Sequence, residues 1–322
     1  MSDSVPGPLT ITEAHALTRK LHRHLATVFL GKPAVLDLAL IALLSEGHVL
    51  IEDVPGVGKT LLAKAIARSL ACKFQRIQFT PDLLPSDLIG TSVFDQSTGK
   101  FVFNTGPIFA QVLLADEVNR ATPRTQSALL EAMSERQVSV DGRTHHLGPP
   151  FMVLATQNHY EFEGTYPLPE SQLDRFLLRV RIGYPARQAE KEILAQHRGG
   201  EPVDQLSTLL SVDEVLALQA TTRAVAVAEP LQDYLLEIVE ATRNAASVRL
   251  GASTRAALSL YRAAQSHALL DKRDYVIPDD IKGLAVSVLA HRLIMKTVQG
   301  ANRADPAEEL VREIVSRLAA PR

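Results

Sequence analysis

The sequence predicts an α/β fold, in which a core built on a parallel β-sheet precedes a smaller domain made of helices. Two patterns predict it. In the first 185 residues, short apolar segments alternate with helical patterns, as expected for parallel strands that helices connect. From Pro185 onward this alternation stops, and one helical pattern follows another. A chain of 322 residues is long enough for two domains. We place their limits at residues 1–185 and 186–322.

Composition and charge restrict the function. Hydrophobic residues make up 46% of the chain, enough for well-packed interiors. The formal net charge of −2 provides no overall basic field of the kind that drives non-specific binding to nucleic acid, so we do not expect a nucleic-acid partner. No secretory signal pattern is visible, and the most apolar segment, residues 34–45, is interrupted by Asp37 and too short to cross a bilayer. We expect a cytoplasmic protein without a membrane insertion.

Two helices precede the first strand. The first begins at Thr10 or Thr12 and ends before Gly31 and Pro33, and it places four apolar residues on one face: Leu17, Leu21, Leu25 and Val28. The second, about residues 34–45, is apolar on most sides. Such all-round hydrophobicity predicts burial against the sheet that follows.

Residues 48–60 have the pattern of a phosphate-binding loop. Apolar residues 48–51 predict a buried strand, and residues 61–70 predict an amphipathic helix. The loop between them ends in Gly-Lys-Thr. Backbone N–H groups of such a loop, at the positive end of a helix, bind phosphate. We expect Lys59 to contact the β- and γ-phosphates of a nucleotide and Thr60 to bind Mg²⁺.

The first position of this loop departs from the G-x-x-x-x-G-K-[ST] motif. Asp53 stands where the motif has glycine, although Gly56 remains to open the turn. A surface turn that contains Gly-Lys-Thr by chance is the alternative, but the preceding strand and the following helix favour a variant of the motif. The predicted nucleotide-binding segment consists of Asp53, Val54, Pro55, Gly56, Val57, Gly58, Lys59, Thr60 and Leu61.

A second strand at residues 74–79 is followed by a hairpin pattern near residues 93–103, and then by a buried strand that ends in Asp116 and Glu117. Parallel strands end at the edge where α/β sheets bind ligands. We predict that Asp116 holds the Mg²⁺ that bridges the β- and γ-phosphates, and that Glu117 orients or deprotonates the attacking water. Alone, such a sequence usually marks a strand that ends in solvent. The phosphate loop upstream reverses this interpretation, since both sites must converge on one nucleotide.

The remaining core elements follow in order. Thr122 and Pro123 begin a helix, and an Asp-Gly turn predicts a second hairpin near residues 138–147. Residues 151–156 predict a buried strand, after which the amide of Asn158 is placed to bind the γ-phosphate or the attacking water. As an isolated residue, Asn158 would more often form a turn. A strand at residues 177–182 completes the core.

The second domain is predicted to be all α. Its six helical patterns lie near residues 187–197, 211–221, 231–246, 254–270, 278–296 and 306–319. The clearest linker is the segment 199–202, Gly-Gly-Glu-Pro.

Together, these segments resemble the MoxR family of AAA+ ATPases over residues 30–300. The resemblance is carried by the segments 52–60, 114–120, 126–133, 155–158 and 163–176, in which the run Gly-Thr-Tyr-Pro-Leu-Pro-Glu is the most specific. It implies an αβα nucleotide-binding core, a helical lid, and a homo-oligomeric ring, usually a hexamer, with ATP at the subunit interfaces. The two predicted hairpins resemble insertions that this branch carries.

The resemblance also implies roles for single residues. Lys59, Thr60, Asp116 and Glu117 match the phosphate, metal and water-activating positions, and Asn158 resembles the first sensor.

Two arginines complete the set that the family implies. Arg175 resembles the arginine finger that reaches the γ-phosphate of a neighbouring subunit. From the sequence alone, Arg175 would rather be a surface arginine paired with Asp174 or another carboxylate. Arg255 resembles the second sensor, and whether it serves its own or the neighbouring nucleotide stays open. Lys32, near the expected adenine site, and His159 depart from the family pattern.

Three functions remain after this comparison of patterns. The leading hypothesis is an ATPase that remodels or activates a protein client, with a partner that carries a von Willebrand factor A domain. The second is an ATP-gated assembly scaffold, which the hydrolytic residues Glu117, Asn158 and Arg175 speak against. The third is a motor subunit of a magnesium-chelatase-like complex or a nucleic-acid translocase, and the near-neutral charge disfavours DNA.

Overall fold

The core of the protein is a five-stranded parallel sheet. The computed structural model describes residues 6–157, 165–296 and 305–321. The strand order is β2-β5-β8-β1-β9, and each neighbouring pair is parallel. The strands are β1 (Val49–Glu52), β2 (Phe74–Gln78), β5 (Val112–Asp116), β8 (Met152–Gln157) and β9 (Leu178–Val180). The α/β class predicted from the sequence is confirmed.

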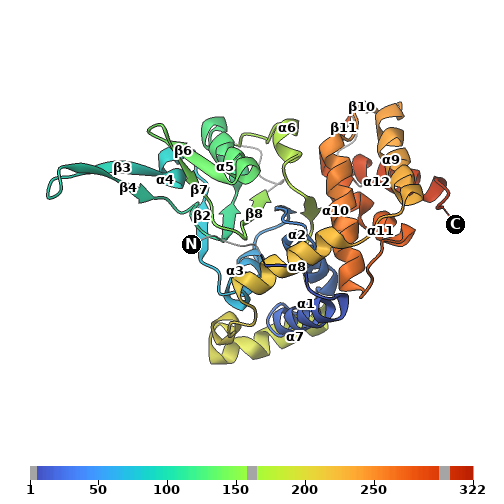
Figure 1. The fold of residues 1–322 in the computed structure, drawn as a ribbon, viewed down its shortest axis with the longest axis horizontal. Helices are drawn as coiled ribbons and strands as arrows, with labels where there is room; N and C mark the ends of the chain where they lie inside the picture. Colours follow the sequence, from blue (N-terminus) through green and yellow to red (C-terminus); the bar gives the residue numbers. More distant parts are fainter. Residues whose placement is uncertain (1–5, 158–164, 297–304, 322) are drawn as a thin grey trace.

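Helices cover both faces of this sheet (Figure 1). Because neighbouring residues of a strand point to opposite faces, Val49 and Ile51 join one hydrophobic cluster while Leu50 joins the other. The first cluster contains α1 (Ile11–Ala26), α2 (Pro33–Leu44) and α3 (Lys59–Ser69). The second contains α4 (Pro85–Ile89) and α5 (Pro123–Glu135).

Helix α1 begins where the sequence predicts a cap. The hydroxyl of Thr10 accepts a hydrogen bond from the Glu13 N–H, and the Glu13 carboxylate accepts one from the Thr10 N–H. This reciprocal capping satisfies N–H groups that have no partner within the helix. Helix α2 has eight buried residues in its 12, in line with the predicted burial.

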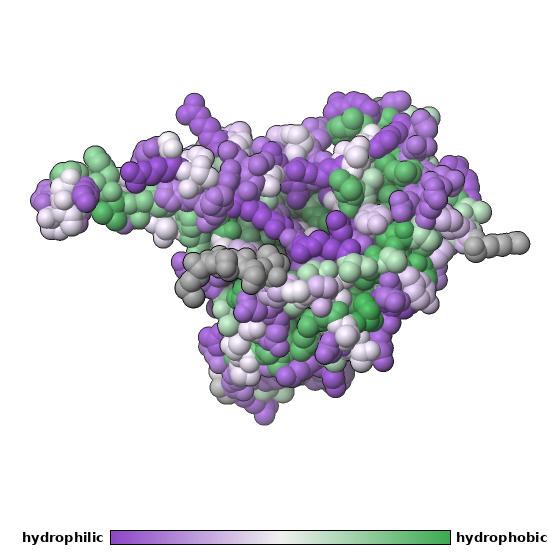
Figure 2. All heavy atoms as spheres, in the orientation of Figure 1, coloured by the Kyte–Doolittle hydropathy of each residue, from purple (hydrophilic) through white to green (hydrophobic). Residues whose placement is uncertain are grey.

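Two hairpins stand at the positions where the sequence predicts them. Strands β3 (Gly90–Asp95) and β4 (Lys100–Thr105) form the first, and β6 (Gln137–Val140) and β7 (Arg143–His146) form the second. The β3–β4 hairpin projects from the body of the molecule (Figure 1). Figure 2 shows hydrophobic side chains on its surface, and the large exposed ones are Val93, Phe94, Phe101 and Val102.

The C-terminal part is mainly helical but not all α. Its helices are α7 (Arg187–Gln196), α8 (Val212–Ala224), α9 (Glu229–Asn244), α10 (Thr254–Leu270), α11 (Pro278–Leu289) and α12 (Pro306–Arg317), with short 3₁₀ helices η2 (His197–Gly199), η3 (Pro202–Gln205) and η4 (Ala290–Arg292). Within the described ranges, none of the helices has the length and apolar character needed to cross a membrane.

The helix predicted at residues 278–296 is wrong after residue 289. Helix α11 ends at Leu289, and β11 (Ile294–Met295) pairs antiparallel with β10 (Val248–Leu250). The short apolar run after α11 fits either a helix or a strand, and periodicity alone does not decide between them. In the structure, tertiary contacts favour the strand. The side chains of His291 and Arg292 both hydrogen-bond the carbonyl of Phe176, and the helix ends just before these two residues.

The N-terminal and C-terminal helices share one hydrophobic cluster, which extends from α1 and α2 to α8, α10 and α11. Polar contacts reinforce it, because Gln219 Nε2 donates to the Leu43 carbonyl at 2.7 Å and the hydroxyls of Ser45 and Ser266 lie 2.7 Å apart. The division of the chain at residue 185 stays a prediction.

Candidate active site

The phosphate loop connects β1 to α3 at the carboxyl edge of the sheet. Gly56 has φ = 82° and Gly58 has φ = 92°, a region that glycine enters without steric cost. A side chain at Gly58 would begin 3.3 Å from the ring of Phe29. Glycine at this position therefore permits both the turn and the close packing of the loop. The Nζ of Lys59 donates to the carbonyl of Asp53 at 2.8 Å, so its side chain folds back along the loop.

Asp53 has a structural role that a glycine would not supply. One carboxylate oxygen accepts the Val54 N–H at 2.8 Å. The other accepts the N–H groups of Ile182 and Gly183, the latter at 2.6 Å. The side chain thereby ties the beginning of the loop to the segment that follows β9. Asp53, the residue that departs from the motif, therefore cross-links two loops at the carboxyl edge.

Asp116 lies at the end of β5, beside Gln78 at the end of β2. Its side chain is buried, and its two oxygens have separate partners. One accepts from Arg76 Nε at 2.7 Å, and the other accepts from the Thr156 hydroxyl at 3.2 Å. The carboxylate is therefore held in a fixed orientation by groups from the strands on both sides of β5.

Glu117 follows directly, with a left-handed backbone of φ = 57° and ψ = 49°. Its N–H donates to the Thr156 hydroxyl at 2.9 Å. Its Oε2 accepts from Gln78 Nε2 at 2.8 Å and lies 3.0 Å from Arg120 Nε. This strained backbone conformation turns the Glu117 side chain away from the position that it would have if β5 continued.

The sequence did not single out Arg76, Gln78 and Thr156. A signal was present for two of them, since Arg76 and Gln78 alternate with the apolar residues Ile77 and Phe79 and therefore share one face of β2. That alternation alone indicates a half-exposed strand, and only the position of β2 next to β5 makes the two polar residues part of the site.

The loop and the carboxylates line one cavity of about 220 Å³, to which Gly56, Gly58, Lys59, Thr60, Asp116, Glu117 and Thr156 contribute. Burial lowers the pKa of Lys59, while the charges of Asp53, Asp116 and Glu117 oppose this shift. Thr60 and Asp116, which carry a hydroxyl and a carboxylate, both line this cavity. Such oxygen donors are the type that Mg²⁺ prefers.

A second cavity, of about 240 Å³, adjoins the first through Gly56 and Gly58. Its apolar walls come from the segment after α1, the phosphate loop with the start of α3, and the segment after β9. They include Val28, Phe29, Leu61, Ile182 and Pro185, and Lys32 also lines the cavity. An apolar pocket that is continuous with a phosphate-binding loop has the character of a site for a nucleotide base.

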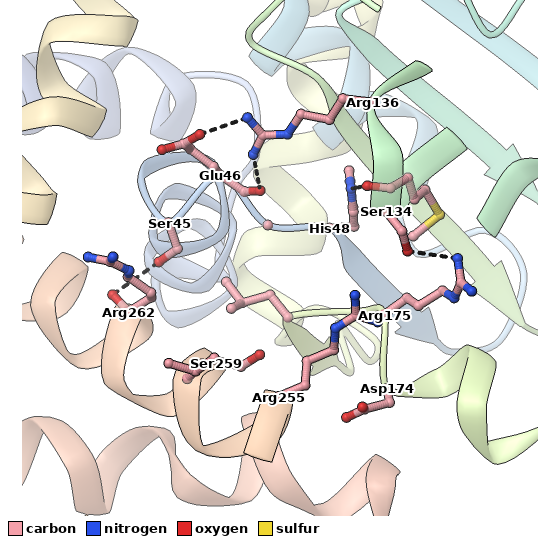
Figure 3. A pocket seen from close by; sticks show the side chains of 14 residues that line it. Ser45, Glu46, His48, Ser134, Arg136, Asp174, Arg175, Arg255, Ser259 and Arg262 are labelled. Atoms are coloured by element: carbon pink, nitrogen blue, oxygen red, sulfur yellow. Dashed lines mark hydrogen bonds and ion pairs between the residues drawn. The ribbon is translucent and has the colours of Figure 1, made fainter. Parts of the chain in front are cut away.

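Arg175 and Arg255 line a third cavity, of about 240 Å³, which shares no lining residue with the phosphate cavity (Figure 3). Gly47 and His48 also line it, immediately before β1, whereas the phosphate loop follows the other end of that strand. The two cavities therefore open at opposite edges of the sheet. The four residues of β1 separate them by about 13 Å of strand.

Arg175 is half-buried against the end of α5. Its Nη1 donates to the Leu130 carbonyl and, at 2.7 Å, to the Ser134 hydroxyl. The surface pairing with Asp174 that the sequence alone suggested does not occur, because Asp174 is bonded to Ser253 and Arg292 instead. Arg255 is exposed near the start of α10 and extends toward Arg175 (Figure 3).

The sequence also predicted a role for Asn158. That residue, together with His159, lies outside the described residues. Strand β8 is described to Gln157, next to β1 and β5, so it runs to the same edge as the phosphate loop and the carboxylates.

Comparison with known proteins agrees with this arrangement. Residues 48–178 match the family described as the ATPase family associated with various cellular activities (AAA), and residues 240–314 match the AAA lid domain. The chaperone MoxR1 of Mycobacterium tuberculosis is 42% identical over 318 residues, which span 96% of this chain and 83% of that protein. The chain belongs to the MoxR family of AAA+ ATPases.

Further relatives support the assignment along the whole chain. The MoxR protein of Methylorubrum extorquens is 29% identical over 98% of both chains, and the protein YeaC of Bacillus subtilis is 47% identical over 96% of both. The crystal structure of a candidate ATPase from Cytophaga hutchinsonii superposes with a TM-score of 0.90, with 38% identity and 97% coverage of both chains. The predicted family, the AAA+ fold with its helical lid, and the ATPase class are confirmed.

Proposed function

We propose that this MoxR-family ATPase hydrolyses ATP at sites shared by neighbouring subunits of a homo-oligomeric ring and uses the reaction to remodel or activate a protein client. The observation that carries the proposal is the separation of the two arginines from the phosphate loop. Arg175 and Arg255 lie at the opposite edge of the sheet from Lys59. This separation supports the proposal that both arginines act on the nucleotide of another subunit.

The groups at the carboxyl edge bind and orient the reactants. The segment Asp53–Leu61 holds the phosphates through its N–H groups and Lys59, and the adjoining apolar pocket holds the base. The oxygens of Thr60 and Asp116 suit Mg²⁺, which neutralises charge on the β- and γ-phosphates when bound.

Glu117 is the group that accepts a proton from the attacking water. Gln78 and Arg120 hold its carboxylate, and Thr156 fixes both its backbone and the orientation of Asp116. Arg175 and Arg255 of a neighbour add positive charge where negative charge develops in the transition state. Asn158 is the remaining proposed contact to the γ-phosphate.

A closed ring satisfies this requirement for every subunit, because a head-to-tail interface joins the carboxyl edge of one copy to the amino edge of the next. We propose a hexamer, the ring size that the family resemblance implies.

The projecting hairpin β3–β4 supports an action on a protein client. Four of its large hydrophobic side chains are about half exposed or more: Val93 48%, Phe94 51%, Phe101 70% and Val102 47%. Contiguous exposed apolar surface of this kind marks interaction sites. A chaperone-like activity also agrees with the name of the M. tuberculosis relative. A protein with a von Willebrand factor A domain stays the partner that the family resemblance suggests.

Replacing Glu117 by Gln tests the proposed chemistry. The Glu117→Gln variant should bind ATP like the parent protein and lose turnover by about 100-fold or more, because it retains the shape of the side chain but not the base. The matched control is Glu131→Gln, which makes the same change at an exposed residue of α5. Turnover at the parental rate in Glu117→Gln would disprove the assignment of Glu117. A pull-down with the ATP-bound Glu117→Gln variant would then identify the client.

A further inference from the structure

Asp174 links the segment that carries Arg175 to the helix that carries Arg255. We propose that Asp174 is a positioning residue, which fixes the two arginines relative to each other so that both address one anion. This inference rests on the proposed function, and the anion is the terminal phosphate of ATP held by a neighbouring subunit.

The link is a hydrogen bond to a helix cap. The Ser253 hydroxyl donates to the Asp174 carboxylate, at 2.9 and 3.0 Å from its two oxygens. The same hydroxyl accepts the Ala256 N–H at 3.1 Å and so caps the start of α10. Arg255 is the second residue of that helix. The residue before Arg175 therefore holds the end of the helix from which Arg255 extends.

Arg292 reinforces this link from within the protein. Its side chain is 2% exposed, and its Nε lies 3.4 Å from Asp174 Oδ1. Its Nη2 donates to the Phe176 carbonyl at 2.5 Å and to the Ser259 hydroxyl of α10 at 3.0 Å. Asp174 supplies the opposite charge that such a buried cation requires. Together, Asp174 and Arg292 join both flanks of Arg175 to α10.

This carboxylate positions the arginines without neutralising them. Asp174 bonds Ser253 and Arg292, while Arg175 bonds groups of α5. The other acidic residue of the cavity, Glu46, is paired with Arg136 and Arg223. Across the described ranges, Arg175 and Arg255 have no carboxylate partner within 4 Å. Two guanidinium groups that face one cavity repel each other unless an anion lies between them. The arrangement thus keeps the positive charge available for a ligand from outside the subunit.

Steady-state ATPase kinetics of Asp174→Ala and Ser253→Ala test the proposal. Each variant should lower kcat by about 10- to 100-fold, because displacing a catalytic group by an ångström has effects of this size. KM for ATP should stay within about twofold of the parent, since the phosphate loop and the apolar pocket are untouched. The matched control is Ser211→Ala, which removes the cap of α8, where Ser211 Oγ accepts the Glu214 N–H at 3.2 Å. It should leave kcat unchanged.

Arg175→Ala separates failure of this inference from failure of the proposed function. If Arg175→Ala retains the parental kcat, the proposed function is wrong. If Arg175→Ala loses turnover while Asp174→Ala and Ser253→Ala retain it, only the positioning role is wrong. A raised KM with a lowered melting temperature in both variants, or an equal loss in Ser211→Ala, would also overturn it. The double variant Asp174→Ala/Arg175→Ala should be no slower than Arg175→Ala, because residues that act as a unit are not additive.

Discussion

The two edges of the central sheet carry opposite halves of the chemistry. At the carboxyl edge, the two carboxylates at the end of β5 are paired within the chain, Asp116 with Arg76 and Glu117 with Arg120. At the amino edge, the described part of the chain offers Arg175 and Arg255 no acidic partner, although both line one cavity. The difference indicates that the carboxyl edge is complete as a binding site, whereas the amino edge requires an anion that the subunit itself does not provide.

The largest expected effect comes from the amino edge. Arg175→Ala should lower kcat by about 10³- to 10⁵-fold, the range for arginine fingers, with little change in nucleotide affinity. Nucleotide binding by calorimetry and turnover by phosphate release would separate the two effects. Arg143→Ala, at an exposed position of β7, is a suitable control. A similar loss of affinity and turnover would mean that the two edges are not functionally distinct.

The buried His48, at the amino edge, makes the stability of the protein depend on pH. Burial is the main cause that lowers its pKa from 6.5 to about 4, while its Nε2 hydrogen-bonds the Met133 carbonyl at 3.1 Å and its Nδ1 accepts the Val153 N–H at 3.0 Å. As the pH falls, His48 takes up a proton in the unfolded chain before it does so in the folded protein. The stability that neutral His48 contributes to the fold is therefore complete above pH 6.5 and is lost as the pH falls toward 4.

Unfolding in urea measures this effect. Between pH 7 and pH 5, His48 should account for about 2 kcal/mol of lost stability. In His48→Gln, the stability at pH 7 should fall, and the slope of stability against pH should become flatter by about that amount. An unchanged slope would show that His48 is not the titrating group. His146→Gln is the control, since His146 is exposed on β7.

At the carboxyl edge, Asp53→Gly tests whether the cross-link to the segment after β9 matters for binding. The change restores the residue of the motif but leaves the N–H groups of Ile182 and Gly183 without their acceptor. We expect KM for ATP to rise about 10-fold, which corresponds to the 1–3 kcal/mol of an unsatisfied polar group. Fluorescent nucleotide titration would measure it. Parental affinity would mean that glycine suffices there.

The smallest effect is expected for Arg76, the cation that pairs with Asp116. Its side chain is half exposed, so solvent screens its charge. In Arg76→Gln, Mg²⁺ no longer competes with a positive charge at Asp116, and half-maximal activity should need about two- to threefold less Mg²⁺. Arg68→Gln, on the far end of α3, should leave the Mg²⁺ requirement unchanged. A higher Mg²⁺ requirement in Arg76→Gln would contradict the competition.

The sequence predicted the carboxyl edge better than the amino edge, for a physical reason. Lys59, Asp116 and Glu117 follow buried strands, and parallel strands bring such positions together whatever the details of packing. Arg76 and Thr156 were missed because their role depends on which strands are neighbours. Arg175 was assigned by resemblance alone, since its contact with the end of α5 joins segments that no local pattern relates.

The C-terminal part was predicted as a series of helices, and its small antiparallel ribbon was missed. The contacts that end α11 come from Phe176, more than 100 positions away in the chain. Helix patterns report local periodicity and burial, not such distant contacts.

Mixing two inactive variants tests the central claim most directly. Lys59→Ala removes the phosphate contact but leaves the arginines intact, whereas Arg175→Ala does the reverse. Each alone should be inactive. If sites form between the carboxyl edge of one subunit and the amino edge of the next, co-assembly of the two should restore ATPase activity, with a maximum near equal amounts. Activity that never exceeds the sum of the separate variants, in rings shown to contain both, would contradict the account.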